Sequence, residues 1–203
     1  LRVGTVFPDT LATQLTALAR AGEATGAELW VMAPMVATAD EAAGFAALAR
    51  ESGLRKVGAM IEIPAAALRA SDLLTHLDFV SIGTNDLSQY TCAVDRMAGG
   101  LAHLLDPWQP AVLDLIAMVG AAGVAAGKSV GVCGEAASDP TLAPVLVGLG
   151  VTSLSMSAPA LPAVRAALSG VDIEKCREAA DVACAARNPQ LAREAVAAIV
   201  GRA

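Results

Sequence analysis

Short apolar runs alternate with longer segments of helical periodicity along most of the chain. Each run spans about four to six residues and is almost wholly apolar, which is typical of a strand buried on both faces. The pattern predicts five strands, at 28–33, 57–62, 78–83, 129–133 and 152–156. Residues 1–6 fit either a strand or a loop.

Helical signals fill most of the intervals between the predicted strands. Asp40 lies near the start of one helix, and Pro64 occupies the first position of another. Asp106-Pro107 begins a long third helix that ends at Gly127. The predicted helices cover about 9–21, 39–51, 64–75, 107–126, 139–149 and 159–169. Strand–helix–strand repetition without hairpin turns predicts a parallel α/β fold.

The pattern changes after Gly170, where the apolar runs stop. Residues 172–185 and 189–201 read as two Ala-rich amphipathic helices separated by Asn188-Pro189. We therefore predict one α/β domain over 1–170 and a helical tail over 171–203, which serves packing or dimer formation.

Composition excludes several classes of protein. The chain of 203 residues is 55% hydrophobic, yet no window approaches the roughly 18 uninterrupted apolar residues of a membrane-spanning helix. A net charge of −6 provides no electrostatic basis for binding nucleic acid or an anionic membrane. The four cysteines form no C-x-x-C pair and no leader precedes them, so we expect reduced thiols and a cytoplasmic protein.

Polar residues gather where the predicted strands end. In parallel α/β folds the active site lies at the carboxyl ends of the strands. The ends carry Glu62, then Thr84-Asn85-Asp86, then Cys133-Gly134-Glu135, and finally Ser155-Met156-Ser157. Two carboxylates, an amide and a thiol are therefore expected on one rim.

Each candidate at this rim has a structural alternative. Glu62 and Asp86 suit a hard cation such as Mg²⁺, which takes one or two carboxylates, but each could instead cap a helix or turn. Cys133 could be a small core hydrophobe. Arg96 suits an anionic ligand, or a surface ion pair with a neighbouring Asp. The two histidines lie near no evident nucleophile, which disfavours a Ser-His-Asp mechanism.

Several segments form a recognisable ordered set: 61–66 (IEIPAA), 83–91 (GTNDLSQYT), 93–96 (AVDR), 132–135 (VCGE) and 154–158 (LSMSA). In this order they closely resemble the phosphoenolpyruvate-utilising enzymes. Within that family the resemblance is strongest to the enzyme I group of bacterial sugar phosphotransferase systems, and it extends over essentially the whole chain.

The resemblance implies a fold and a chemistry. The family's phosphoenolpyruvate-binding domain is a (βα)₈ TIM-type barrel that dimerises. By motif, Glu62 and Asp86 would ligate Mg²⁺, while Asn85, Asp86 and Arg96 would bind the substrate. Cys133 would protonate the enolate carbon as pyruvate forms. The phosphoryl group would pass to a His on another domain and then to the phosphocarrier protein HPr.

The chain departs from the family pattern in two ways. Ile63 stands where the family usually has a Thr after the metal-binding Glu. A barrel of this type needs eight strands and typically about 250 residues, whereas five strands are predicted here. We therefore expect the later part of a barrel, inactive alone, with an open apolar face that promotes self-association.

Other functions remain open on the sequence alone. Pyruvate phosphate dikinase and phosphoenolpyruvate synthase share the barrel chemistry but use a nucleotide. A Mg²⁺-dependent aldolase of the citrate-lyase type shares the Glu and Asp ligands on a related barrel, although it needs no thiol acid. A dimerisation module without catalytic activity is the third alternative.

Overall fold

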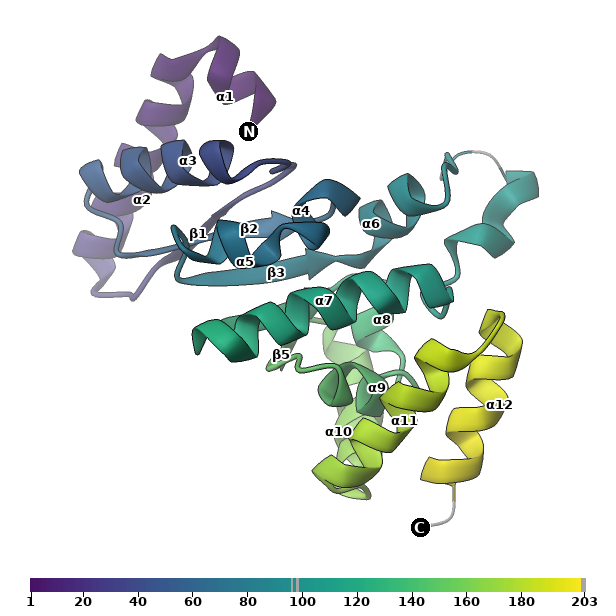
Figure 1. The fold of residues 1–203 in the computed structure, drawn as a ribbon. Helices are drawn as coiled ribbons and strands as arrows, with labels where there is room; N and C mark the ends of the chain where they lie inside the picture. Colours follow the sequence, from purple (N-terminus) through teal and green to yellow (C-terminus); the bar gives the residue numbers. More distant parts are fainter. Residues whose placement is uncertain (96, 98, 202–203) are drawn as a thin grey trace.

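Five parallel strands form one sheet in which the spatial order equals the order along the chain (Figure 1). The computed structural model describes residues 1–95, 97 and 99–201. Its strands are β1 (Trp30–Ala33), β2 (Lys56–Ile61), β3 (Phe79–Gly83), β4 (Ser129–Cys133) and β5 (Ser153–Leu154). All neighbours pair in parallel. The predicted parallel α/β class is thus confirmed, and sequential parallel order is the arrangement of a partial barrel.

Helices follow each strand, most of them within the predicted ranges, whereas α6 and α8 were not predicted. They are α2 (Pro8–Thr25), α3 (Ala39–Glu51), α4 (Pro64–Leu68), α5 (Ala70–Leu74), α6 (Thr84–Thr91), α7 (Pro110–Ala126), α8 (Glu135–Ser138), α9 (Ala143–Gly148) and α10 (Leu161–Ser169), with 3₁₀ turns η1 (Gly99–Leu105) and η2 (Ala158–Ala160). α3 begins with a capping box between Thr38 and Glu41, so Asp40 lies in its first turn. α7 ends at Gly127 in the left-handed conformation, as predicted.

Alternate side chains of the strands point to two different faces of the sheet. The covered face, which packs against helices such as α3 and α7, is at most 1% exposed. Its residues are Val57, Ala59, Ile61, Val80, Ile82, Val130 and Val132. Together with the inward side chains of the helices they form the hydrophobic core.

The opposite side of the sheet, here named the open face, has a different composition. It consists of Trp30, Met32, Lys56, Gly58, Met60, Phe79, Ser81, Gly83, Ser129, Gly131, Cys133 and Ser153. Trp30 is 52% exposed and Met32 40% exposed. Phe79 lies over Gly58, and its ring centre is 4.9 Å from that of Trp30. The open face therefore leaves large apolar side chains in contact with solvent.

The tail forms the two predicted helices, α11 (Ile173–Ala185) and α12 (Pro189–Val200). Asp172 and Asn188 cap them by accepting hydrogen bonds from the backbone N–H of Lys175 and Leu191. α11 packs against α9, α7 and α12. In Figure 1 these helices lie at one end of the molecule and the N-terminal helices at the other.

Several local predictions were wrong. Residues 2–6 form a short helix, α1 (Arg2–Val6), whose side chains are not buried. The predicted helix over 64–75 is divided at Arg69, and only α9 lies within the one predicted over 139–149. The long third helix begins at Pro110 and not at Asp106-Pro107. The last strand is only Ser153–Leu154. Pairing partners and packing, rather than local composition, set these boundaries.

Among the described residues, no single helix is long and apolar enough to cross a membrane. One bent pair of helices, Gly99–Leu105 with Pro110–Ala126, meets the criteria of length and composition when taken together.

Candidate active site

The carboxyl ends of β2, β3 and β4 bring the predicted polar residues to one edge of the sheet. Ile61 pairs with Ile82, and Gly83 pairs with Cys133. Glu62 follows β2 directly, and α6 starts at Thr84 directly after β3. Because the strands are parallel and in register, Glu62, Asp86 and Cys133 come from three adjacent chain segments.

Glu62 is held in place on both sides of its carboxylate. It is only 6% exposed, and its Oε1 accepts a hydrogen bond from the backbone N–H of Met35 at 2.7 Å. Met35 has a positive φ of 53°, which directs this N–H from the loop after β1. A Cβ at Gly83 would lie 2.9 Å from Oε2, so a larger residue there would displace the carboxylate. The buried carboxylate is therefore positioned by the loop after β1 on one side and by β3 on the other.

Cys133 lies at the end of β4 with a half-buried thiol. Its Sγ is 3.5 Å from the carbonyl oxygen of Ile82 and 3.8 Å from Sδ of Met60. Burial raises the pKa of the thiol, and a hydrogen bond with Ser81 lowers it in part. The thiol is thus kept in its protonated form at neutral pH.

The nearby carboxylates act on the same thiol. The negative charges of Glu62, Asp86 and Glu135 each raise the pKa of Cys133 further. Because Coulomb interactions weaken with distance, all three acidic groups lie near enough to Sγ to act on its pKa. The structure therefore brings together Glu62, Asp86, Cys133 and Glu135, all of which the sequence placed at the rim.

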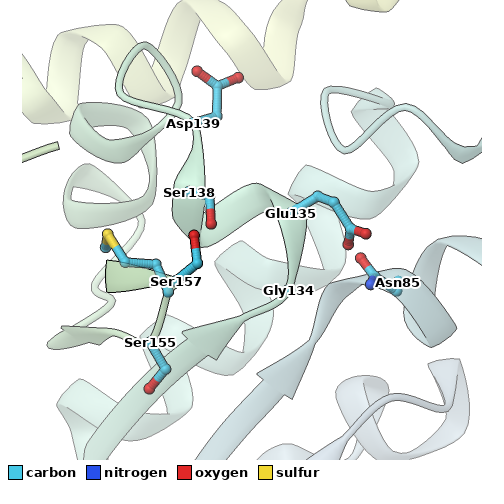
Figure 2. Close-up of a pocket in the computed structure, with 8 residues that line it drawn as sticks. Asn85, Gly134, Glu135, Ser138, Asp139, Ser155 and Ser157 are labelled. Atoms are coloured by element: carbon cyan, nitrogen blue, oxygen red, sulfur yellow. The ribbon is translucent and has the colours of Figure 1, made fainter. Parts of the chain in front are cut away.

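Asn85 lies where α6 begins, next to the loop after β4. The hydroxyl of its neighbour Thr84 donates a hydrogen bond to the carbonyl oxygen of Cys133 at 2.9 Å. Gly134 has φ +87°, and a Cβ there would lie 2.9 Å from Oδ1 of Asn85. Figure 2 shows the side chains of Asn85 and Glu135 pointing toward one another. The glycine thus permits the close approach of the two loops.

Two hollows adjoin Asn85. An open cleft of about 710 Å³ is lined by Asn85, Gly134, Glu135, Ser138, Asp139, Ser155, Met156 and Ser157. A second hollow of about 450 Å³ is lined by Thr84, Asn85, Ser88, Ala102, Leu105, Pro107 and Glu135. Both offer amide, hydroxyl and carboxylate groups, which suits a small polar ligand.

The donor set can be tested against Mg²⁺. The described part of the chain contains no group of three or more His, Cys, Asp or Glu side chains that could hold a metal. Mg²⁺ needs only one or two protein carboxylates, because water and substrate oxygens complete its shell. Glu62 and Asp86, at adjacent strand ends, fit this requirement.

The predicted and the observed site residues differ at three positions. Arg96, which was predicted, lies outside the described residues. Ser81 and the N–H of Met35 were not anticipated. Ser81 had a signal, as the polar residue within the apolar run of β3, whereas nothing in the sequence indicates that Met35 faces Glu62.

Comparison with known proteins defines the class. The family described as "PEP-utilising enzyme, PEP-binding domain" matches residues 1–173. The chain belongs to this family, in which PEP denotes phosphoenolpyruvate. The resemblance inferred from the ordered motifs is thereby confirmed.

Three curated relatives narrow the class further, since each is named phosphoenolpyruvate-protein phosphotransferase. The relative from Streptomyces coelicolor is 57% identical over 194 residues, which is 95% of this chain and 35% of the relative. Relatives from Geobacillus stearothermophilus and Haloferax volcanii are 43% and 42% identical, over 83% and 85% of this chain and 31% and 33% of their own length. The chain spans about a third of the length of these relatives.

A solved structure supports the fold. The crystal structure of a citrate lyase from Burkholderia xenovorans matches with a TM-score of 0.52 and 19% sequence identity, covering 85% of this chain and 62% of the other. At this identity the likeness concerns the fold alone, and the 62% coverage agrees with the arrangement of a partial barrel.

Proposed function

We propose that this chain is the C-terminal part of a phosphoenolpyruvate-protein phosphotransferase. In the proposed reaction phosphoenolpyruvate gives its phosphoryl group to a His on a domain outside these residues, and pyruvate is released. The observation that carries the proposal is the strand register, which pairs Ile61 with Ile82 and Gly83 with Cys133, so that Glu62, Asp86 and the Cys133 thiol follow from adjacent strand ends. The names of the relatives favour this function over that of a dikinase or an aldolase.

Glu62 and Asp86 are the proposed Mg²⁺ ligands. When bound, the ion supplies positive charge that neutralises the phosphoryl group and the developing enolate. The bond from the Met35 N–H fixes the orientation of Glu62, so one of its oxygens stays directed while the other faces Gly83. The proposed substrate-binding residues are Asn85, Asp86 and Arg96. Asn85 would bind the substrate by an amide hydrogen bond, Asp86 through the ion, and Arg96 by its charge.

Cys133 is the proposed proton donor. When the P–O bond of phosphoenolpyruvate breaks, its electron pair stays with the oxygen and forms the enolate of pyruvate. The methylene carbon then takes the proton from Sγ, a C–H bond forms, and a thiolate remains to be reprotonated by solvent. The raised pKa of Cys133 suits this role, because the thiol still holds its proton at neutral pH.

The proposed cellular setting follows from the same assignment. The partners would be phosphoenolpyruvate, pyruvate and, through the full-length enzyme, the phosphocarrier protein HPr. All four cysteines, which lie among the described residues, are free, and this supports a reducing cytoplasm. The exposed apolar residues of the open face support a homodimer or another form of association.

The metal ligands are tested in the full-length enzyme that contains this chain. Glu62→Gln or Asp86→Asn should abolish phosphoryl transfer while the circular dichroism spectrum stays unchanged, because one carboxylate holds Mg²⁺ poorly against water. Asp72→Asn is the matched control, since Asp72, on α5, forms a surface ion pair with Arg69. Near-normal turnover of either variant at ordinary Mg²⁺ concentrations would refute the assignment.

The acid is tested separately. Cys133→Ala should fold and bind phosphoenolpyruvate but lose pyruvate formation by roughly 10²-fold or more, the usual scale for a general acid. Cys92→Ala is the control, since Cys92 is also half-buried but lies at the end of α6. Normal turnover of Cys133→Ala, or a loss of stability typical of a core residue, would exclude the acid role.

A further inference from the structure

A polar network connects the C-terminal helix to the segment between η1 and α7. Arg193 on α12 donates two hydrogen bonds to Asp106, from Nη1 to Oδ2 and from Nη2 to Oδ1, both at 2.8 Å. Its guanidinium carbon also lies 5.3 Å from the ring centre of Trp108. A two-pronged charged contact of this kind defines direction as well as distance. α12 therefore holds Asp106 in one orientation.

The network continues through Trp108 to the loop after β4. Trp108 is fully buried, and its backbone N–H donates to Oδ1 of Asp106 at 3.0 Å. Its indole Nε1 donates to Oδ2 of Asp139 at 2.9 Å. Burial raises the pKa of Asp139, but hydrogen bonds from Trp108, Thr141 and Leu142 outweigh it, and the pKa lies below its ordinary value. Asp139 is therefore a charged anchor for the indole.

Both ends of this network border the hollows around Asn85. Asp106 lies between Leu105 and Pro107, which form part of the wall of the 450 Å³ hollow that Asn85 also lines. Asp139 lines the 710 Å³ cleft, and Figure 2 shows its side chain pointing away from the other labelled side chains. A displacement of Asp106 would move this wall relative to Asn85.

We infer that Arg193 is a positioning residue for substrate binding: through Asp106 and Trp108 it holds the part of the wall that Leu105 and Pro107 form in the hollow lined also by Asn85. The inference rests on the proposed function, because it takes phosphoenolpyruvate as the ligand of that site. The family match ends at residue 173, and α12 lies beyond it. On this inference the tail supplies a residue that positions part of the substrate site.

The test measures steady-state kinetics of the full-length enzyme with phosphoenolpyruvate. Arg193→Ala should raise KM for phosphoenolpyruvate on the order of tenfold, the scale of a lost charged hydrogen-bonded pair, while kcat changes by less than about twofold. Asp106→Asn should act in the same direction. The double variant should be hardly worse than the stronger single one, because both remove the same contact. Arg177→Ala is the control, since Arg177 pairs with Glu174 on the surface of α11.

Two further variants keep the outcome decisive. Arg193→Lys retains the charge but not the two-pronged geometry, so its KM should lie between those of the wild type and Arg193→Ala; it also replaces Arg193→Ala if that variant does not fold. An unchanged KM in Arg193→Lys and Asp106→Asn, or a fall in kcat alone, would overturn the inference. If Glu62→Gln abolishes turnover while these variants keep the wild-type KM, only the inference fails; if Glu62→Gln is active, the proposed function fails.

Discussion

The covered and open faces of the sheet are built from alternate residues of the same strands, yet they differ in burial and in the kinds of side chain that they contain. On β3, Val80 and Ile82 are at most 1% exposed, whereas Ser81 between them contacts the thiol of Cys133. Branched aliphatic side chains fill the covered face, while the open face combines large residues with Gly and Ser. The first face supplies the burial that stabilises the fold, and the second contains the proposed catalytic thiol of Cys133 at its carboxyl edge.

The difference has an energetic consequence. Burial contributes about 25 cal/mol per Å² of apolar surface removed from water, so side chains of the covered face contribute nearly their full transfer energy. Trp30 and Met32 gain only part of theirs, because much of their surface still meets water. Substitutions on the two faces should therefore separate stability from association.

The largest effect is expected on the covered face. Ile82→Ala removes a fully buried side chain from the centre of the core and should lower the free energy of unfolding by about 2–5 kcal/mol. Urea denaturation followed by circular dichroism measures this loss. A change below about 1 kcal/mol would contradict the assignment of this face to the core.

A smaller effect on stability, but a larger one on association, is expected on the open face. Trp30→Ser removes the contact with Phe79 and should cost about 1 kcal/mol. The isolated chain should be oligomeric at micromolar concentration, and Trp30→Ser together with Met32→Ser should shift it toward monomer. Light scattering decides this: a stable wild-type monomer that unfolds cooperatively would show that the open face needs no cover.

The smallest effect is expected in the pH at which the thiols of Cys133 and Cys184 react. Alkylation by iodoacetamide requires the thiolate, so the raised pKa of Cys133 should move its reaction to higher pH than that of an unperturbed thiol. Glu62→Gln removes a negative charge and should move the midpoint back toward lower pH. Burial raises the pKa of Cys184 to about 11, and this thiol is the internal reference. Mass spectrometry measures the extent of alkylation of each cysteine as a function of pH. If Glu62→Gln leaves the midpoint pH of Cys133 alkylation unchanged, Glu62 does not lie close enough to act on this thiol.

Much of the fold could be predicted because buried parallel strands and proline-started helices leave strong local signals. β2, β3 and β4 appear within one or two residues of the predicted strands, and α11 and α12 match the predicted tail. The helix α6 was not predicted, since Thr, Asn and Ser near its start favour turns as much as helices. Its formation depends on docking beside β3.

The candidate site could be predicted only where it consists of side chains at strand ends. Glu62, Asp86 and Cys133 follow from that rule. The N–H of Met35 and the link from Arg193 to Asp106 depend on backbone conformation and on contacts between distant segments. A single sequence contains no local pattern for either, because the partners are separated by many residues and neither has a distinctive neighbourhood.

The sequential order of the strands also bears on how the chain folds. Phe79 of β3 pairs with Ser129 of β4, whereas the other neighbouring strands pair over roughly half that separation in sequence. Each doubling of a closed loop adds about 0.6 kcal/mol of entropic cost, so joining β3 to β4 is the most demanding closure in the sheet. A chain emerging from the ribosome can assemble β1 to β3 early, then must wait for α7 and β4 before the edge of β3 is protected. The loop closure with the highest entropic cost therefore spans the same stretch, between α6 and β4, that contains Asp106 and Trp108.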